Sequence, residues 1–349
     1  MPSFHILPGR AFEKDGTEWL YFSGTSYLGI PHNPDFRTFL IEGIEQYGSN
    51  FGGSRLSNSS FYIFEEAEAY LAKWAGAPAA LTISSGTLAG QLCAKVLSQQ
   101  GLIHYAPGSH PALDIQGEIP DISFAAWSAR MVEKSYREKA PLILATNSVD
   151  PLRMEDYDFR FIKALNPNAV ITLLIDDSHF LGIGGKNGSG IYQLLGEAHK
   201  LRLVVVASMG KALGIPGGVV LSDKTFIRQL KQTPLFGGAS PVIPAYLYAF
   251  FKGQAVYEAA RKKLLERITL FNSFVSTTEC FKFRKGFPVY YSPRNYLYDY
   301  LVKHHIFISS FSYPSPETTP ITRIILNALH TEADIRRLIE VLKKYQHLR

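Results

Sequence analysis

Four short runs of aliphatic residues recur between residues 79 and 207, and each run ends in small or polar residues. The runs are 79–83, 141–146, 169–175 and 203–207, and helical patterns separate them. Continuous aliphatic and β-branched runs of this length are typical of strands that are buried on both faces of a parallel sheet. Their alternation with helices predicts an α/β fold with a mostly parallel, doubly wound sheet.

Flanking segments predict further elements. A tight turn at Asp15 and Gly16 separates two short strands, and residues 33–47, 61–74 and 245–275 have helical patterns. Towards the C-terminus the strand candidates lie within 281–292 and 321–329, and a final amphipathic helix follows Thr331.

The length of 349 residues exceeds what one hydrophobic core usually serves, so we expect two subdomains. We place their boundary near residue 254. The expected division is an N-terminal segment over 1–43 that packs with the small domain, a large domain over 44–254, and a small α+β C-terminal domain over 255–349.

Composition narrows the class of protein. Hydrophobic residues make up 46% of the chain and charged residues 19%, as in a folded protein. The 36 basic and 30 acidic residues are dispersed, so no nucleic-acid footprint is visible. Cys93 and Cys280 have no disulfide or zinc-ligand spacing, and no apolar run is long enough to span a bilayer. We therefore expect a cytoplasmic protein without a metal and without nucleic-acid or membrane partners.

Lys211 follows the aliphatic run 203–207 by a few residues and lies among glycines and small residues. Open α/β sheets bind ligands at the carboxyl ends of their strands, and desolvation at such a place lowers the pKa of a lysine and makes the amine nucleophilic. A solvated lysine in a glycine-rich turn is the alternative that this stretch alone leaves open.

Asp176, Asp177 and His179 follow another of these strands, ahead of the glycine-rich stretch 182–190. Two carboxylates beside a histidine can bind a metal, exchange protons, or pair with a cationic ring nitrogen. Metal binding is the weaker alternative because no further cluster supplies the remaining ligands. The glycines follow the acidic residues, whereas a dinucleotide fingerprint precedes one, and Lys211 has no phosphate-loop motif around it.

Residues 84–87, Ser-Ser-Gly-Thr, join a strand to a helix expected over 88–98. A helix start of this kind either binds an anion through its free amides or is simply capped by serine. Pyridoxal 5'-phosphate (PLP) is a cofactor that needs a lysine, an acid against its pyridine nitrogen and an anion site for its phosphate. This chain offers all three at predicted strand ends.

Several blocks, in order along the chain, resemble the α-oxoamine synthases of the fold-type I PLP-dependent enzymes, the group that includes 8-amino-7-oxononanoate synthase and glycine C-acetyltransferase. The blocks are YLG at 27–29, GSNFGGSR at 48–55, SSGTLAGQ at 84–91, IDDSHFLGIGGKNGSG at 175–190 and SMGKALGIPGG at 208–218. The resemblance implies a fold-type I transferase with a large PLP-binding domain, here 44–254, and a smaller C-terminal domain.

The same resemblance implies roles for individual residues. Lys211 would form the Schiff base with PLP and shuttle a proton, and Asp176 would pair with the pyridinium nitrogen. His179 would lie near the phenolic oxygen of the ring, whereas His110 would stack on the ring and help to position the substrate. Ser208 would contact the phosphate. Asp177 would be structural.

Further roles follow from the resemblance. The amides of Gly86, Thr87 and Leu88 would hold the phosphate, and Ser240 could replace a threonine that reaches the phosphate of a neighbouring subunit. Arg323 would bind the carboxylate of the amino acid, for which its fork of donors has the right shape.

The implied activity is the condensation of an amino acid with an acyl-CoA or acyl-carrier-protein thioester, with decarboxylation, by a homodimer that carries PLP. Residues 146–151 depart from the family pattern, because they lack its glutamate and a later serine. A PLP-dependent aminotransferase is therefore the nearest alternative. A non-catalytic homologue that serves as a binding module is a third.

Overall fold

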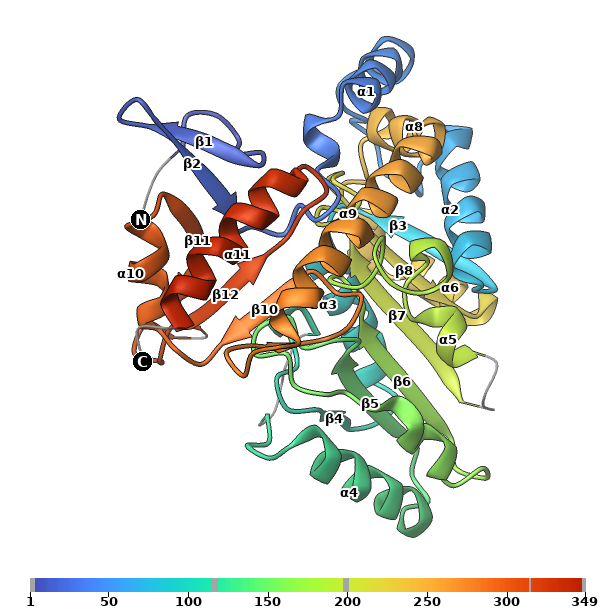
Figure 1. The fold of residues 1–349 in the computed structure, drawn as a ribbon. Helices are drawn as coiled ribbons and strands as arrows, with labels where there is room; N and C mark the ends of the chain where they lie inside the picture. The colour runs from blue at the N-terminus through green and yellow to red at the C-terminus, as the bar shows by residue number, and fades with distance from the viewer. Residues whose placement is uncertain (1–3, 114–118, 197–200, 314, 347–349) are drawn as a thin grey trace. The chain divides into compact units, whose positions relative to one another are not determined.

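The computed structural model describes residues 4–113, 119–196, 201–313 and 315–346 (Figure 1). Its contacts divide the chain into two compact units. Unit 1 comprises residues 1–33, 151–155 and 255–349, and unit 2 comprises residues 34–150 and 156–254. The division into 1–43, 44–254 and 255–349 stays a prediction.

Unit 2 is built on a six-stranded sheet with the strand order β3-β8-β7-β6-β5-β4. Its strands are β3 (Ala79–Ile83), β4 (Ile103–Tyr105), β5 (Leu142–Asn147), β6 (Ile171–Asp176), β7 (Arg202–Ser208) and β8 (Gly218–Ser222). Strands β4 to β7 pair in parallel, whereas β8 runs antiparallel to both of its neighbours, β7 and β3. The predicted α/β fold with a mostly parallel sheet is confirmed.

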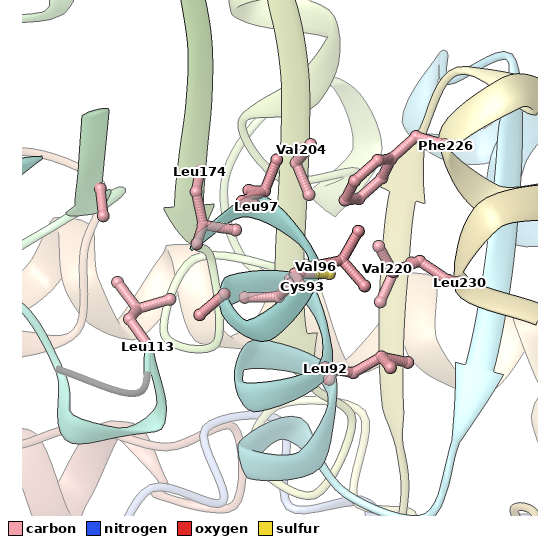
Figure 2. Close-up of a cluster of buried hydrophobic side chains, with 14 of the residues drawn as sticks. Leu92, Cys93, Val96, Leu97, Leu113, Leu174, Val204, Val220, Phe226 and Leu230 are labelled. Carbon is pink, nitrogen blue, oxygen red and sulfur yellow. The ribbon is translucent and has the colours of Figure 1, made fainter. Parts of the chain in front are cut away.

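The helices of unit 2 are α1 (Pro34–Tyr47), α2 (Tyr62–Ala75), α3 (Gly86–Ser98), α4 (Phe124–Arg137), α5 (Tyr192–Gly196), α6 (Lys224–Lys231), α7 (Pro234–Gly238) and α8 (Pro244–Lys252). Figure 2 shows the apolar face of α3, with Leu92 and Val96, among side chains of the sheet such as Leu174, Val204 and Val220. Burial of each such side chain contributes about 1.5–3 kcal/mol. This packing fixes α3 against the sheet.

Unit 1 contains a second six-stranded sheet, with the order β1-β2-β11-β12-β10-β9. Its strands are β1 (Ala11–Lys14), β2 (Thr17–Phe22), β9 (Lys282–Phe283), β10 (Val289–Ser292), β11 (Ile306–Phe311) and β12 (Ile321–Ile325), and its helices are α9 (Gln254–Val275), α10 (Tyr296–Val302) and α11 (Glu332–Gln346). Only the pair of β11 and β2 is parallel among the described strands of this sheet. Ile335, Leu338 and Leu342 of α11 are buried, as the amphipathic pattern predicts.

The sequence patterns place most elements within a few residues, with two instructive differences. The helical stretch 245–275 is two helices, because the backbone at Gly253 leaves the helical conformation. Helix α3 begins at Gly86 rather than at Leu88, because Ser85 caps it and accepts the Leu88 amide at 3.1 Å. Within the described ranges, none of the helices has both the length and the apolar character that a membrane span requires.

Candidate active site

Polar residues lie at the carboxyl ends of three neighbouring strands of unit 2. Strand β5 ends at Asn147, β6 at Asp176 and β7 at Ser208. Asn147 pairs in register with Asp176, and Asp176 pairs with Val206. Because the three strands are parallel, these residues gather at one edge of the sheet, which is where open α/β sheets bind their ligands.

Lys211 lies in the reversal of the chain that joins β7 to β8. Two backbone hydrogen bonds close this reversal: Met209 N–H donates to the Gly217 carbonyl at 2.9 Å, and Ile215 N–H donates to the Met209 carbonyl at 3.1 Å. Burial lowers the pKa of the Lys211 amine, and the negative charge of Asp176 opposes this shift only in part. The amine therefore loses its proton, and becomes nucleophilic, at a lower pH than an ordinary lysine.

Asp176 is 7% exposed, and both of its carboxylate oxygens have neighbours. Oδ1 accepts a hydrogen bond from Ser178 N–H at 2.9 Å, and Oδ2 lies 3.7 Å from His110 Nδ1. The adjacent Asp177 is fully buried, and its Oδ2 accepts Ile191 N–H at 3.0 Å at the end of the glycine-rich loop. Asp176 thus supplies negative charge at the sheet edge, while Asp177 anchors the loop.

His110 carries a neutral imidazole in this arrangement. Its Nδ1 accepts Ala112 N–H at 3.1 Å, which requires an unprotonated Nδ1 and puts the ring proton on Nε2. Burial lowers the pKa of His110; attraction to Asp176 opposes this shift, and repulsion from Lys211 adds to it. The ring therefore stays uncharged near neutral pH.

Asn147 holds the loop that carries His110, and the sequence pattern does not single it out. Its Oδ1 accepts His110 N–H at 3.1 Å, and its Nδ2 donates to the Gly108 carbonyl at 2.7 Å. Ser178 has a similar linking role, because its Oγ accepts Ser208 N–H at 2.8 Å. A polar residue directly after an aliphatic run is the signal that points to Asp176, and the same signal could have pointed to Asn147.

The first turn of α3 meets the end of β7. A Cβ atom on Gly86 would lie 2.6 Å from Ser208 Cα, so only glycine permits this approach. Leu88 N–H donates to Ser85 Oγ, whereas the amides of Gly86 and Thr87 come first in the helix and have no carbonyl partner within it. Of the three amides that the resemblance assigns to the phosphate, two are thus positioned to receive an anion.

The remaining predicted residues are His179, Ser240 and Arg323. His179 is half-buried in the turn after β6, and Ser240 is exposed between α7 and α8. No hydrogen bond of the described chain joins Ser240 to the residues at the strand ends. Arg323 belongs to β12 of unit 1, where it is buried and donates to the Pro151 carbonyl.

The contacts of unit 2 bring together Lys211, Asp176, His110, Ser208 and Gly86. In the part of the chain that the structure describes, no three His, Cys, Asp or Glu side chains are grouped so as to hold a metal ion. The assembled groups are an amine of lowered pKa, an oriented carboxylate, a neutral imidazole and a helix start. They can bind an anion and exchange protons beside it.

A family model described as aminotransferase class I and II matches residues 132–342, which is more than half of the chain. The chain belongs to this family. The matched region contains Asn147, Asp176, Lys211 and Arg323, so it spans the strand ends of unit 2 and β12 of unit 1.

Curated members of similar sequence support a narrower comparison within the aminotransferase class I and II family. The 8-amino-7-oxononanoate synthase of Cupriavidus necator is 26% identical over 376 residues, which cover 96% of this chain and 90% of the relative. The 8-amino-7-oxononanoate synthase of Dechloromonas aromatica is 26% identical, covering 96% of this chain and 92% of the relative. Both comparisons agree with the resemblance to α-oxoamine synthases.

Solved structures show that this family member has the fold of the fold-type I transferases, as the sequence predicts. The serine palmitoyltransferase of Sphingomonas wittichii superposes with a TM-score of 0.82 at 15% identity, covering 98% of this chain and 91% of that one. The 8-amino-7-oxononanoate synthase of Francisella tularensis gives 0.75 at 21% identity, covering 95% and 98%. A serine palmitoyltransferase from S. paucimobilis, solved with a bound PLP–myriocin aldimine, gives 0.80 at 18% identity, covering 96% and 89%.

Proposed function

We propose that this chain is a PLP-dependent acyltransferase that condenses an amino acid with an acyl-CoA or acyl-carrier-protein thioester. The observation that carries the proposal is the grouping of Lys211, Asp176 and the start of α3 at one edge of the sheet. The overall reaction forms a bond between the α-carbon of the amino acid and the acyl carbon. It breaks the bond from the α-carbon to the carboxylate and the bond from the acyl carbon to sulfur, and with the uptake of one proton it releases CO2 and the free thiol.

The residues at the strand ends fit PLP. The close approach of Gly86 to Ser208, which a Cβ atom would fill, sets two helix amides beside a serine hydroxyl and so makes a cradle for a phosphate. Lys211 offers an amine to the aldehyde, and Asp176 offers a carboxylate to the ring nitrogen. When bound, PLP supplies the aldehyde that reacts with amines and a cationic ring that withdraws electrons from the α-carbon.

Each side chain has a separate task in the proposed reaction. The Lys211 amine would hold the cofactor and later carry a proton at Nζ, which its lowered pKa favours. Asp176 would keep a proton on the ring nitrogen, and Ser178 orients this carboxylate by donating to Oδ1. The neutral ring of His110 would lie against the cofactor, and Asn147 fixes its backbone.

The roles of His179, Ser240 and Arg323 are part of the proposal and rest on the family resemblance. His179 would face the phenolic oxygen of PLP, and Ser240 would reach the phosphate of a second subunit. Arg323 would bind the carboxylate of the amino acid. The names of the curated relatives, which are 8-amino-7-oxononanoate synthases, support a condensing reaction over other PLP chemistry.

The test compares two reactions of the PLP-loaded chain in separate assays. Amino acids are supplied with acyl-CoA thioesters in one assay and with keto acids in the other, and the assays measure CO2 release and amino transfer. We expect CO2 release that depends on the thioester. Exclusive amino transfer would contradict the proposal and establish the alternative aminotransferase, which stays open because Asn147 stands where the synthase pattern has a glutamate.

Replacement of Lys211 gives the first prediction. Lys211→Ala should abolish both the visible absorbance of the PLP-loaded chain and CO2 release, because the amine that holds the cofactor is gone. Lys186→Ala removes an exposed lysine of the same unit and should retain both signals. A wild-type chain that stays colourless with PLP would instead indicate the non-catalytic binding module.

We also propose that the protein works in the cytoplasm as a homodimer. Exposed apolar side chains in unit 2 support the homodimer. Ile41 of α1 is 52% exposed, Leu56 is 55% exposed and Tyr62 of α2 is 86% exposed. Interfaces of homodimers are more apolar than the rest of a protein surface. Light scattering of the PLP-loaded chain should give twice the mass of one chain, and a monomer that binds PLP fully would refute the dimer.

A further inference from the structure

The loop that carries His110 is held by a second side chain besides Asn147. The hydroxyl of Tyr157 donates a hydrogen bond to the Pro107 carbonyl at 2.8 Å. Tyr157 is 8% exposed and belongs to unit 2, as does the loop. A buried hydroxyl that donates to a main-chain carbonyl ties that part of the main chain to its own position, because buried polar groups keep their hydrogen-bond partners.

Tyr157 is itself fixed by aromatic packing. Its ring stacks on Phe124, the first residue of α4, with the centroids 4.4 Å apart and the planes at 12°. Phe124 is buried and also contacts the rings of Trp127, Phe159 and Phe161 at centroid distances of 5.5–6.0 Å. Because aromatic side chains in such a cluster interlock, the phenol can shift only if several rings repack.

The loop fits closely around the Tyr157 hydroxyl. Gly108 has a φ of +71°, in the left-handed region that favours glycine, and a Cβ atom there would lie 2.9 Å from Tyr157 Oη. The Gly108 carbonyl accepts the hydrogen bond from Asn147 Nδ2. Two consecutive carbonyls of the loop, those of Pro107 and Gly108, are therefore each held by a different side chain.

Both ends of the loop are attached to main-chain atoms. At its start, Ala106 N–H donates to the carbonyl of Ala145 in β5 at 2.8 Å, and Ser109 Oγ donates to the Ala106 carbonyl at 2.7 Å. At its end, His110 Nδ1 accepts Ala112 N–H. The direction of the imidazole therefore follows from the path of the main chain, and a shift at Pro107 is passed on to the ring.

We propose that Tyr157 is a positioning residue for His110. Its hydroxyl holds the Pro107 carbonyl and so keeps the imidazole next to the Asp176 carboxylate, where Nδ1 lies 3.7 Å from Oδ2. As a statement about catalysis, this inference rests on the proposed function, in which His110 lies against the cofactor. Asn147 and Tyr157 then act on one loop from two places in the chain, shortly before unit 2 is interrupted and directly after it resumes.

The first experiment removes only the hydroxyl. Tyr157→Phe keeps the ring that stacks on Phe124, so the chain should fold and the PLP-loaded variant should keep its visible absorbance. We expect kcat/KM to fall about fivefold, because one hydrogen bond to the loop is lost. Tyr136→Phe removes the hydroxyl of a tyrosine of α4 that is 62% exposed and should leave kcat/KM unchanged. A Tyr157→Phe variant with the wild-type kcat/KM would overturn the proposal.

The second experiment follows the titration of His110 by NMR in the cofactor-free chain, with its signal identified by its absence in His110→Gln. Burial lowers the pKa of His110, and the charged groups that face it are Asp176 and Lys211. A loosened loop admits water to the ring, so the pKa should rise in Tyr157→Phe and stay the same in Tyr136→Phe. A lower kcat/KM with an unchanged titration would show that Tyr157 acts elsewhere and would refute the proposal. No PLP or substrate is needed here, so the result holds even if the proposed function fails.

A double variant tests whether the two side chains act on the same loop. When either of them is removed, the loop has already lost part of its attachment, so the second loss should matter less. The fall in kcat/KM of Asn147→Ala combined with Tyr157→Phe should therefore be smaller than the product of the two single falls. A fall equal to that product would show that the two residues act independently, which contradicts the shared role.

Discussion

Asp176 sets the charge that Lys211 and His110 experience. Its carboxylate raises the pKa of both groups, against the stronger effect of burial. Asp176→Asn should therefore lower both pKa values further. The measurement is the pH dependence of Lys211 modification by an amine reagent in the cofactor-free chain, located by mass spectrometry. Asp156→Asn, which changes an exposed carboxylate of the same unit, is the control. A midpoint that rises in Asp176→Asn would contradict this account.

Asn147 positions His110 through two hydrogen bonds at opposite ends of one amide. Asn147→Ala should retain the PLP absorbance and reduce kcat/KM about tenfold, because each lost bond contributes roughly 0.5–1.5 kcal/mol. Asn147→Asp keeps the acceptor for His110 N–H but loses the donor to the Gly108 carbonyl. Its kcat/KM should therefore lie between those of the wild type and Asn147→Ala. Loss of the absorbance in Asn147→Ala, or an unchanged kcat/KM, would argue against a positioning role.

Sequence patterns find residues whose role follows from local structure. Lys211 and Asp176 can be predicted because each comes shortly after an aliphatic strand, and strand ends bind ligands. Asn147 is at a strand end too, but its function depends on a partner 37 residues away, and the one-dimensional pattern does not show that partner. For Leu88 the resemblance predicts that its amide binds the phosphate. In the structure this amide instead donates to the local cap, Ser85 Oγ.

At the scale of elements, α3 depends on close contact with its surroundings. A Cβ atom on Gly90 would lie 2.1 Å from the Ala112 carbonyl oxygen. Gly90→Ala should therefore lower the free energy of unfolding by about 1–3 kcal/mol, as overpacked substitutions do. Gly238→Ala in α7 is the matched control, because a Cβ atom added there would meet no other residue's heavy atom within 4 Å. It should change the free energy of unfolding by less than about 0.5 kcal/mol. Denaturant titration of both variants is the measurement, and equal stabilities would contradict the contact.

Most strands and helices can be predicted from their periodicity, whereas some short or mixed elements cannot. Strand β11 is missed because its sequence, IFISSF, places serines beside aliphatic residues and shows neither a continuous apolar run nor a clean alternation. Strand β4 has only three residues, too few for any period to appear. The interruption between α8 and α9 depends on the backbone at Gly253, a residue that a helix otherwise tolerates.

At the scale of the whole molecule, the sequence indicates two subdomains but not how the chain alternates between them. Residues 151–155 cluster with the terminal segments in unit 1, although they interrupt the run of unit 2. No change of composition marks residues 151–155 as belonging to a different unit from their neighbours in the sequence. Contacts such as the one from Arg323 to the Pro151 carbonyl hold the segment in unit 1, and they join residues 172 positions apart.

A buried histidine makes the stability of unit 1 depend on pH. His330 Nδ1 accepts Asn327 N–H at 3.0 Å, and Nε2 lies 3.0 Å from the Tyr21 carbonyl, an arrangement that requires a neutral ring. Burial lowers the pKa of His330 from 6.5 to about 4. Between these values the unfolded chain binds more protons than the folded one, so this stabilisation is present above pH 6.5 and declines as the pH falls.

We expect the wild-type chain to lose roughly 3 kcal/mol of its free energy of unfolding between pH 6.5 and pH 4 through His330. His330→Gln has no such group and should show a correspondingly shallower slope of stability against pH. Denaturant unfolding across this pH range is the measurement, and parallel slopes for the two chains would refute the assignment.

The single reversed strand of unit 2 has a consequence for how this protein can diversify. Because β8 turns back beside β7, Lys211 is carried on a short loop whose closure depends on main-chain atoms of Met209, Ile215 and Gly217. Much of the closure of this loop is therefore independent of the side chains that face a reactant. Evolution can exchange those side chains to suit a new reactant while the main chain that carries the lysine keeps its path.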